Sequence, residues 1–583
     1  MRANGVHRRI QSLSLASLVA ASTLVAAQEQ PLQPEEASGW TAKKAVSAKR
    51  YMVAAAHPLA ARAGLAMLGR GGSAIDAMIA TQLVLGLVEP QSSGLGGGAY
   101  LLHYDAGRRG LTAIDARETA PAGATPELFM RGGRAIDFQS AKAGGWSVGV
   151  PGTPRLLEVA HARWGRLAWA TLFEPAIALA ENGFRTTPRL ARLAASEGVG
   201  TEALARAYLL DARGNAKPAG TLLRNPEYAR TLRALAAHGA DAFYTGEIAQ
   251  AIVDTVRNHP RPGTLSMEDL AGYRVQEADT VCAPYRAYRL CGVGPSTYGG
   301  IAVLQVMGAL ARFDMALVRP NSSAAVHLVA EAERLAYADR NRYGADGRFV
   351  PVPVAGLIAA GYIAQRSALI SPAKSMGRAQ AGAPHASAAA LADDARDERA
   401  GTTHIAIVDR EGNAVSMTST IEGSFGSRLM ARGFFLNNEL TDFNFAPVEE
   451  GRAVANAVAP GKRPRSSMAP IAVFDARTGA LEMVLGSPGG SFIIGFVAKA
   501  LVATLDWRMD VQSALDLPNF VSRNGPTEIE RGTQLEASAA ALKAMGHDVQ
   551  AIDMTSGLHA IRRTAHGWQG GADARREGIA VGR

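Results

Sequence analysis

Cysteine is nearly absent from this chain of 583 residues, which has only two, Cys282 and Cys291. They flank residues 283–290, which we predict to form a hairpin with Pro284 near its start. In an oxidising compartment a local disulfide would fit this spacing, but two unpaired structural thiols fit it equally well, so both readings stay open. Neither reading supports a catalytic cysteine. The histidines show no paired metal-ligand spacing either, so neither a metal site nor a cofactor is expected.

Long uncharged apolar runs are also missing. The one near the N-terminus, 13–25, is shorter than the roughly 20 residues that a membrane-spanning helix needs. Arg8 and Arg9 precede it and small residues end it at Ala27, which is the pattern of a secretion signal. We therefore expect a signal peptide over 1–27, a periplasmic or secreted mature protein, and no stable membrane span.

A strong charge of either sign is lacking as well. The formal net charge is +9, from 61 basic and 52 acidic residues, and the basic residues are scattered along the chain. This balance gives no reason to expect nucleic-acid binding. The 48% of hydrophobic residues instead predicts a globular protein with a sizeable core, long enough for one large or two to three ordinary domains.

Helical and strand patterns alternate along the chain. Most of 51–88 looks helical, with a break at Gly71-Gly72 followed by Ser73 as an N-cap and Asp76 in the capping-box position. A glycine-rich turn then leads into a strand over 99–104. Further helices are predicted over 154–164, 171–182, 227–238 and 324–339. This mixture predicts a layered fold of sheets and helices.

The periodicity disappears between residues 371 and 400, where alanine, glycine, serine and charged residues dominate. A structureless tract of this length within a domain is unusual and often functional. A strand is predicted directly after it, over 403–409, and a second returns over 414–420 after a loop with Gly412.

This hairpin predicts a register. If Asp409 opposes Asn413, then Thr402 lies opposite Thr420, so that one hydroxyl faces another across the ladder.

The Gly401-Thr402 junction can carry chemistry. A free α-amine has a pKa of about 8 and can take the proton of its own residue's hydroxyl, which makes an N-terminal threonine a nucleophile. Such an amine exists only after the bond between Gly401 and Thr402 is broken, and the same hydroxyl could attack the Gly401 carbonyl. An ordinary junction between a loop and a strand is the alternative interpretation.

Several segments, in the same order along the chain, resemble the γ-glutamyltranspeptidases, or glutathione hydrolases, of the N-terminal-nucleophile hydrolase superfamily. These segments are Ser-Ser-Gly-Leu-Gly-Gly-Gly (92–98), Asp-Ala-Arg-Glu (115–118), Gly-Val-Pro-Gly (149–152), Gly-Thr-Thr-His (401–404), Leu-Asn-Asn-Glu-Leu-Thr-Asp-Phe (436–443), Lys-Arg-Pro-Arg-Ser-Ser-Met (462–468) and Gly-Ser-Pro-Gly-Gly (486–490). Together they span nearly the whole mature chain. The resemblance implies an α+β fold, the four-layer αββα sandwich of that superfamily.

The resemblance also implies the catalytic residues. Thr402 would be the nucleophile and new N-terminus, released by cleavage between Gly401 and Thr402. Thr420 would be the partner hydroxyl that holds and helps to activate it. Gly489 and Gly490 would form the oxyanion hole, because consecutive backbone N–H groups in a turn without side chains can converge on a developing alkoxide.

Other matching positions imply a site for the zwitterionic end of a γ-glutamyl donor. Arg117 would clamp the α-carboxylate, since a guanidinium suits bidentate contact with a planar anion. The remaining implied residues are Ser466 and Ser467 for the carboxylate, and Glu422, Glu439 and Asp442 for the ammonium. Without the motifs, a surface ion pair and a solvated acidic loop would be the alternatives.

The resemblance thus implies a self-processing γ-glutamyl acyltransferase or hydrolase that cleaves the γ-glutamyl amide of glutathione and related small-molecule donors, with water, amino acids or peptides as acceptors. Its large subunit would cover 28–401 and its small subunit 402–583, intertwined in one domain. Two departures leave the acyl group open: Glu422 stands where many members have asparagine, and the segment between Phe443 and Asn456 is short. The short segment resembles the lidless bacterial subtype. The alternatives are a cephalosporin (glutaryl-type) acylase or another amidase of the same family, and an exported binding protein without turnover.

Overall fold

The computed structural model describes Met1 and residues 36–385, 391–394, 396–399 and 401–583. Its contacts divide the chain into two units, Met1–Leu32 and Gln33–Arg583, and the elements below all belong to the second. The signal peptide predicted over 1–27 lies outside the described residues apart from Met1. No helix within the described ranges is long and apolar enough to cross a bilayer.

The first of two large sheets has seven antiparallel strands. In spatial order they are β25 (Ile579–Gly582), β2 (Met52–Ala55), β12 (Thr402–Val408), β13 (Ala414–Thr420), β3 (Gly98–Asp105), β4 (Gly110–Ala116) and β9 (Gln276–Ala278). The predicted hairpin of β12 and β13 therefore lies at the centre of this sheet. Strands from before residue 401 flank it on both sides.

The second large sheet also has seven antiparallel strands. Its spatial order is β1 (Val46–Ala48), β24 (Gly567–Ala572), β23 (His559–Thr564), β19 (Leu481–Gly486), β18 (Ile471–Asp475), β11 (Tyr288–Val293) and β10 (Thr280–Tyr285). The two sheets pack face to face, with β12 and β13 against β19 and β23.

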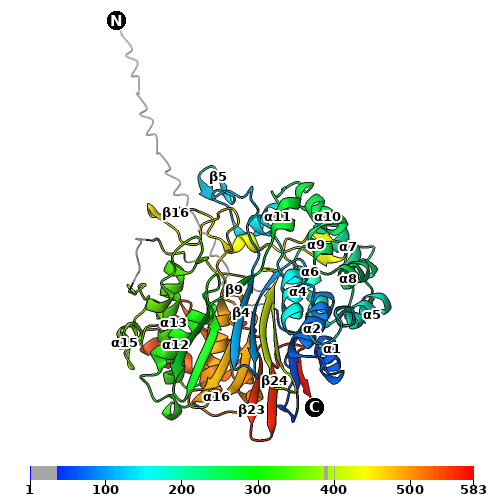
Figure 1. The fold of residues 1–583 in the computed structure, drawn as a ribbon. Coiled ribbons are helices and arrows are strands. Elements are labelled where there is room, and N and C mark those ends of the chain that lie inside the picture. The colour runs from blue at the N-terminus through cyan, green and yellow to red at the C-terminus, as the bar shows by residue number, and fades with distance from the viewer. Residues whose placement is uncertain (2–35, 386–390, 395, 400) are drawn as a thin grey trace. The chain divides into compact units, whose positions relative to one another are not determined.

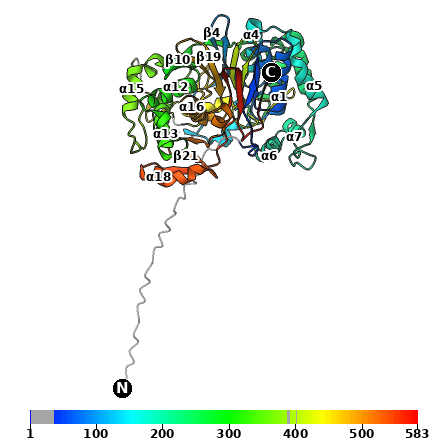
Figure 2. The same cartoon turned by 90° about the horizontal axis from the view of Figure 1, so that it is seen from below.

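Helices cover the outer face of each sheet (Figure 1). On the first sheet lie α1 (Pro58–Gly69), α2 (Ala74–Val88) and α4 (Thr153–Trp164); on the second lie α12 (Gly299–Leu310), α16 (Ile493–Leu505) and α17 (Val511–Asp516), with α13 (Ser323–Tyr343) packed on α12. Seen from below, the strands lie between α12 and α16 on one side and α1 on the other (Figure 2). The predicted four-layer αββα sandwich is confirmed.

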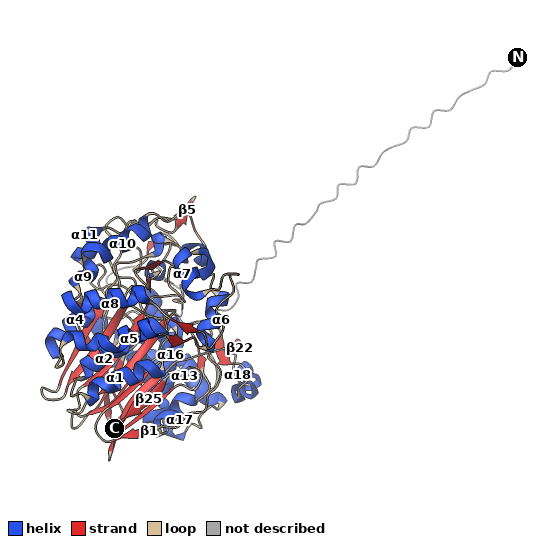
Figure 3. Ribbon diagram, turned by 90° about the vertical axis from the view of Figure 1, so that its right-hand side faces the viewer, coloured by secondary structure: helices blue, strands red, loops and turns tan. Residues whose placement is uncertain are grey.

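Further helices surround this sandwich, and α1, α2 and α5 lie in front of the strands in Figure 3. They are α3 (Phe138–Lys142), α5 (Glu174–Asn182), α6 (Pro188–Ser196), α7 (Ala203–Leu209), α8 (Pro226–His238), α9 (Asp241–Tyr244), α10 (Gly246–Arg257), α11 (Met267–Gly272), α14 (Val354–Leu357), α15 (Ala360–Ala368) and α18 (Ala539–Ala544). Helix α5 packs on α2 and α8, so α2 has neighbours on its outer side as well as on the sheet side.

Helix α2 shows why the sequence reads as a buried helix. Ser73 Oγ accepts the N–H of Asp76 and the Asp76 carboxylate accepts the N–H of Ser73, so the predicted capping box is present. Every residue of the helix is buried, because the first sheet covers one side and other helices cover the rest. A helix that is apolar all round fits this position.

One helix prediction needs correction. Residues Met52–Ala55, predicted as helical, form strand β2, because their alanine-rich sequence pairs with β12 and β25 and tertiary pairing overrides helix propensity. The helix predicted over 171–182 is present: residues 171–173 belong to a 3-10 helix, Trp169–Phe173, which leads directly into the α-helix α5, Glu174–Asn182.

The cysteine-bearing segment forms the predicted hairpin, from β10 and β11. Cys282 and Cys291 lie directly opposite each other in its register and form a disulfide. Of the two alternatives that the sequence left open, the structure has the disulfide. Neither of these two cysteines is therefore available as a thiol nucleophile.

Candidate functional site

Thr402 and Thr420 lie opposite each other at one end of the central hairpin. Thr402 is the first residue of β12, Thr420 is the last of β13, and the two are paired in the ladder. The Thr402 hydroxyl donates to the Thr420 hydroxyl at 3.3 Å, and both residues are buried. The predicted register is confirmed.

The Thr420 hydroxyl also contacts the peptide carbonyl that precedes Thr402. It donates to the Gly401 oxygen at 2.9 Å and accepts the N–H of Glu422 at 2.8 Å. The backbone N–H of Ile421 donates to the same Gly401 oxygen at 3.3 Å. One hydroxyl therefore links the Thr402 hydroxyl to a carbonyl that two donors polarise, which suits attack on that carbonyl.

Gly401 has no room for a side chain. A Cβ at this position would lie 2.1 Å from the backbone oxygen of Glu422 and 2.6 Å from the carbonyl carbon of Gly423. Glycine is therefore required by the close approach of two backbone segments, and not only by the need for an unhindered carbonyl.

The glycine pair that follows β19 lies against the segment just before Thr402. Gly489 and Gly490 have φ values of 137° and 55°, so both adopt backbone conformations that favour glycine. A Cβ on Gly490 would lie 2.4 Å from the carbonyl oxygens of Glu398 and Arg399. The N–H of Ser491 donates to the Glu398 oxygen at 3.2 Å. The structure thus brings the turn predicted as an oxyanion hole next to residues 398–399.

Arg117 follows β4 and is buried among acids. Its guanidinium pairs with Glu439 and lies 2.5 Å from an oxygen of Asp442, and it donates to the Arg465 carbonyl at 2.9 Å. Burial alone would lower the pKa of Arg117, but the carboxylates of Glu439 and Asp442 raise it well above its ordinary value. The arginine predicted to clamp a carboxylate and two acids predicted to hold an ammonium are thus brought together, in contact with each other.

Burial and the charge of Arg117 act in opposite directions on the pKa values of the acids in this cluster. Burial raises the pKa of Glu439 and of Asp442 well above the ordinary values, and the charge of Arg117 opposes the shift. Burial also raises the pKa of Glu118 to about 7, against the same opposing charge. Sequence reasoning missed Glu118, although it directly follows Arg117 in a matching motif.

Glu422 lies between the Thr420 hydroxyl and the segment before Thr402. It accepts hydrogen bonds from the Asn438 amide and, at 3.1 Å, from the N–H of Arg399. Burial raises its pKa, while Lys142 and the bond from Asn438 oppose the shift.

The two predicted serines differ in their contacts. The hydroxyl of Ser466 accepts the N–H of Met468 at 3.1 Å, and the Ser466 carbonyl accepts the Thr297 hydroxyl. The N–H of Ser467 donates to a carboxylate oxygen of Glu398 at 2.6 Å, and its hydroxyl accepts from Arg340 Nε at 2.9 Å. Sequence reasoning missed both Glu398 and Arg340. The only signal was an acid shortly before Thr402.

One group of described residues has the donor atoms of a metal site. His327 and Glu331 lie one turn apart on α13, and His547 approaches them, with all ligand atoms within 4.8 Å of one another. His327 Nδ1 is 2.7 Å from His547 Nε2. The other ring nitrogen of His327, Nε2, is 2.7 Å from the Ser371 carbonyl oxygen. Glu331 accepts from Arg334, Ser375 and Met376. Hydrogen bonds within the protein thus engage all three side chains. The expectation that no metal is needed stays a prediction.

Comparison with protein families matches residues 60–583 to the gamma-glutamyltranspeptidase family. The chain is 35% identical over 550 residues to the glutathione hydrolase proenzyme of Bacillus subtilis (strain 168). This aligned region covers 92% of this chain and 92% of the relative. The chain is also 36% identical over 546 residues to the acylase ACY 1 proenzyme of Pseudomonas sp. (strain SE83), covering 91% of this chain and 93% of the relative.

Solved structures agree with this. The cephalosporin acylase of Bacillus halodurans superposes with a TM-score of 0.81 at 26% identity, covering 93% of this chain and 97% of the acylase. The gamma-glutamyltranspeptidase of Helicobacter pylori superposes with a TM-score of 0.54 at 31% identity, covering 58% of this chain and 95% of that chain. The chain belongs to the gamma-glutamyltranspeptidase family.

Proposed function

We propose that this chain is a precursor that cuts itself between Gly401 and Thr402 and then acts as a γ-glutamyl acyltransferase or hydrolase. The observation that carries the proposal is the Thr420 hydroxyl, which contacts both the Thr402 hydroxyl and the Gly401 carbonyl. Relatives that are called proenzymes support a processed precursor. The family is one of enzymes, so turnover is favoured over binding alone.

In the self-cleavage step, Thr402 Oγ1 attacks the Gly401 carbonyl carbon and loses its proton toward Thr420. The C–N bond breaks, the amide nitrogen takes a proton, and an ester joins Gly401 to the Thr402 oxygen. Water then hydrolyses the ester, which leaves a carboxylate on Gly401 and a free amine on Thr402. The Ile421 N–H and the Thr420 hydroxyl are the donors placed on the oxygen that becomes negative.

In the catalytic step, the Thr402 amine takes the hydroxyl proton and the oxygen attacks the donor's γ-carbonyl. The amine of the donor leaves, and water or the amine of an amino acid or peptide then attacks the acyl-enzyme. The N–H groups of Gly489 and Gly490 would hold the oxyanion. Residues assigned to donor binding are Arg117, Ser466 and Ser467 for the carboxylate, and Glu422, Glu439 and Asp442 for the ammonium.

The proposed products are a large subunit, 28–401, and a small subunit, 402–583. The start at residue 28 rests on the predicted signal peptide and on export to the periplasm or the medium. N-terminal sequencing of both fragments from exported protein tests both boundaries, because each boundary predicts its own first residue.

The central test is a gel of purified protein with turnover of a γ-glutamyl-anilide. We expect two fragments and release of the aniline, whereas Thr402→Ala should remain one uncut, inactive chain. Thr403→Ser is the matched control, since it changes the adjacent β12 threonine and should still be cut. A fully active uncut chain would refute the mechanism and leave the binding-protein alternative in place.

A glutaryl-type acylase is the second candidate, favoured by the likeness to ACY 1 and to the Bacillus halodurans acylase. A glutaryl group has a carboxylate but no ammonium, so it would leave the acids around Arg117 without a cationic ligand group. We therefore expect faster turnover of γ-glutamyl-anilide than of glutaryl-anilide. The reverse ratio would favour the acylase.

A further inference from the structure

The carboxylate of Glu398, four residues before Thr402, lies in a buried anion-binding site. One oxygen accepts the N–H of Ser467 at 2.6 Å, and the other lies 2.5 Å from Arg340 Nη2. That second oxygen is also 3.5 Å from Arg465 Nε. Glu398 is 4% exposed, so these contacts form away from solvent. A backbone N–H and two guanidinium groups thus surround one carboxylate.

The guanidinium of Arg340 is oriented by hydrogen bonds to groups other than Glu398. Its Nε donates to the Ser467 hydroxyl at 2.9 Å and its Nη1 donates to Asn341 Oδ1 at 2.9 Å, which fixes the plane of the guanidinium. Arg340 is buried, and Glu398 is its ion-pair partner among the described residues. If Glu398 left, a buried cation would lose its counter-charge, which is costly unless another anion replaces it.

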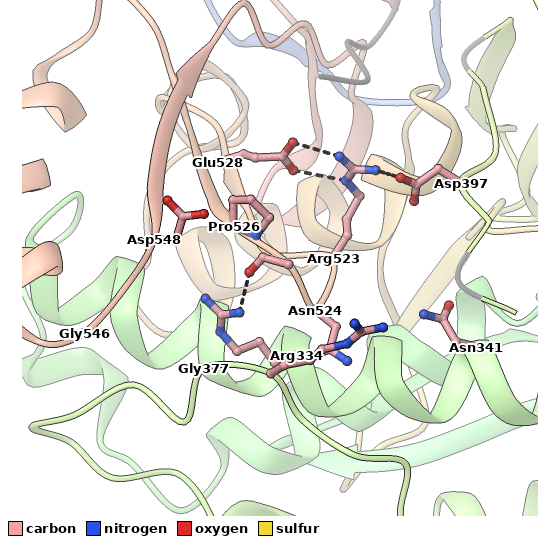
Figure 4. Close-up of a pocket in the computed structure, with 12 residues that line it drawn as sticks. Arg334, Asn341, Gly377, Asp397, Arg523, Asn524, Pro526, Glu528, Gly546 and Asp548 are labelled. Carbon is pink, nitrogen blue, oxygen red and sulfur yellow. Dashed lines mark hydrogen bonds and ion pairs between the residues drawn. The ribbon is translucent and has the colours of Figure 1, made fainter. Parts of the chain in front are cut away.

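Two other acidic residues of the same segment, Asp394 and Asp397, also form ion pairs with arginines. Asp394 lies 3.3 Å from Arg465 Nη1 and accepts from the Asn456 amide at 3.0 Å. Asp397 pairs with Arg523, which also pairs with Glu528. Figure 4 shows Asp397, Arg523 and Glu528 beside a cavity of about 490 Å³, so this part of the segment borders open space.

The same segment crosses the glycine turn. The carbonyl oxygens of Glu398 and Arg399 each lie 2.4 Å from the position that a Cβ of Gly490 would take, and the Ser491 N–H donates to the Glu398 carbonyl. In the uncut chain, residues 398–399 therefore lie on the proposed oxyanion turn while the Glu398 side chain fills the anion site beside Ser467. While the segment lies there, a donor cannot place its carbonyl oxygen on the glycine turn and its carboxylate in the anion site.

From this geometry we propose that Glu398 is a built-in substitute for the donor's α-carboxylate, and that Arg340 is a further residue of the donor site. Self-cleavage frees the chain end at Gly401, Glu398 withdraws, and the donor's carboxylate takes its place on Arg340 and the Ser467 N–H. The inference rests on the proposed function, because that function supplies the donor. It adds a specificity residue and explains how the precursor is kept from binding substrates before it is cut.

The first test measures ligand binding without turnover. In the uncut Thr402→Ala background, calorimetric titration with L-glutamate and with glutarate should show weak or no binding. Adding Glu398→Ala should improve the affinity for at least one of them by tenfold or more. Adding Asp393→Ala instead is the matched control, since that acid of the same segment pairs with Arg342 outside the anion site, and it should change nothing. Equal affinities in the Glu398→Ala and control chains would overturn the inference.

The second test concerns the cut enzyme. Arg340→Ala should raise KM for a γ-glutamyl-anilide by tenfold or more while changing kcat less, and Arg340→Lys should recover part of the loss. Arg342→Ala, on the same helix, should leave KM unchanged. An unchanged KM in Arg340→Ala, or an equal loss in both arginine variants, contradicts the role of Arg340. If Arg340→Ala is not cut, Arg340→Lys alone decides, since an unchanged KM in it would also contradict the role.

The outcomes separate the inference from the proposed function. If the wild type turns over γ-glutamyl donors but Glu398→Ala gives no gain in ligand affinity, the inference falls and the function stands. If Glu398→Ala gains affinity for glutarate while the wild type turns over no γ-glutamyl donor, the carboxylate site stands and the γ-glutamyl function falls.

Discussion

At the residue scale, the Thr420 hydroxyl combines two contacts in one group. It accepts from the hydroxyl of Thr402 and donates to the carbonyl of Gly401. Because it also accepts the N–H of Glu422, its orientation is fixed by three partners. A group with these contacts can hold the nucleophile and polarise its target at the same time.

Removing the Thr420 hydroxyl should therefore slow self-cleavage. We expect Thr420→Ala to slow it by about 10² or more, since a single oxyanion donor is worth about 10²–10³ in rate. Thr420→Ser, which keeps the hydroxyl, should retain most of the rate. The measurement is a time course of fragment appearance on a gel from freshly folded precursor. Equal rates in the alanine and serine variants would mean that the hydroxyl is not involved.

Glu333, buried in α13, gives a prediction for stability against pH. Burial raises its pKa from 4.5 to about 8, although the N–H of Ser522 donates to it at 2.7 Å. Between pH 4.5 and 8 the folded chain keeps a proton that the unfolded chain has lost. The free energy of unfolding should therefore fall as the pH rises through this window, by about 1.4 kcal/mol per pH unit from this group.

The test is Glu333→Gln, which removes the titrating group. Relative to its parent, the variant should become more stable by a few kcal/mol on going from pH 5 to pH 8, about 1.4 kcal/mol for each unit. Urea unfolding in the uncut Thr402→Ala background measures this with one chain. Glu174→Gln, at an exposed ion pair on α5, is the control and should show no such trend. Parallel pH curves for Glu333→Gln and its parent would contradict the prediction.

At the scale of elements, the hairpin of β12 and β13 positions the two threonines by its own short loop. The loop residues bond locally: the Asp409 carboxylate accepts the N–H groups of Glu411 and Asn413, and the Gly412 N–H donates to the Asp409 carbonyl. These bonds fix which residues face each other, so the opposition of Thr402 and Thr420 follows from counting along two strands. Asp409 also accepts the N–H of Ala74, which ties the loop to the start of α2.

The capping box of α2 should contribute measurably to stability. Ser73→Ala removes the hydroxyl that accepts the Asp76 N–H and should lower the free energy of unfolding by about 1 kcal/mol, whereas Ser73→Thr should keep most of it. Urea unfolding in the uncut background measures the difference. If both variants matched the parent, the cap would be energetically neutral at this buried helix end.

At the scale of the whole molecule, the strands of the two proposed subunits interleave. In the first sheet, β12 and β13 come from after the cut, and they are flanked by β2 and β3 from before it. In the second sheet, β11 from before the cut pairs with β18 from after it. Neither subunit could keep its sheets intact if the other left.

The two fragments should therefore remain together after cleavage. Cut protein should elute from a sizing column at the same position as uncut Thr402→Ala chain under native conditions, and should separate into fragments only in denaturant. The fragments should also refold poorly when renatured apart. Fragments that dissociate in native buffer would contradict the interleaved arrangement.

Local patterns predicted much of this molecule. The helices α1, α2, α4 and α8 and the strand β3 agree closely with the apolar periodicity and caps in the sequence, because each depends on nearby residues. Strand β2 was predicted wrongly, since its alanine-rich sequence has no strand signal of its own and pairing with β12 and β25 decides its state. Residues Glu118, Glu398 and Arg340 were missed because their neighbours are remote in sequence.

The sequence by itself determined the chemistry that is available: a glycine-threonine junction, a hydroxyl brought opposite it by a local hairpin, and a family order of motifs. Tertiary structure alone decided which groups meet around that junction. It placed Arg117 among Glu439 and Asp442, and Glu398 on Arg340 and Ser467. The physical reason is that hairpin register depends on a few adjacent residues, whereas the pairing of buried charges depends on how distant strands and helices pack.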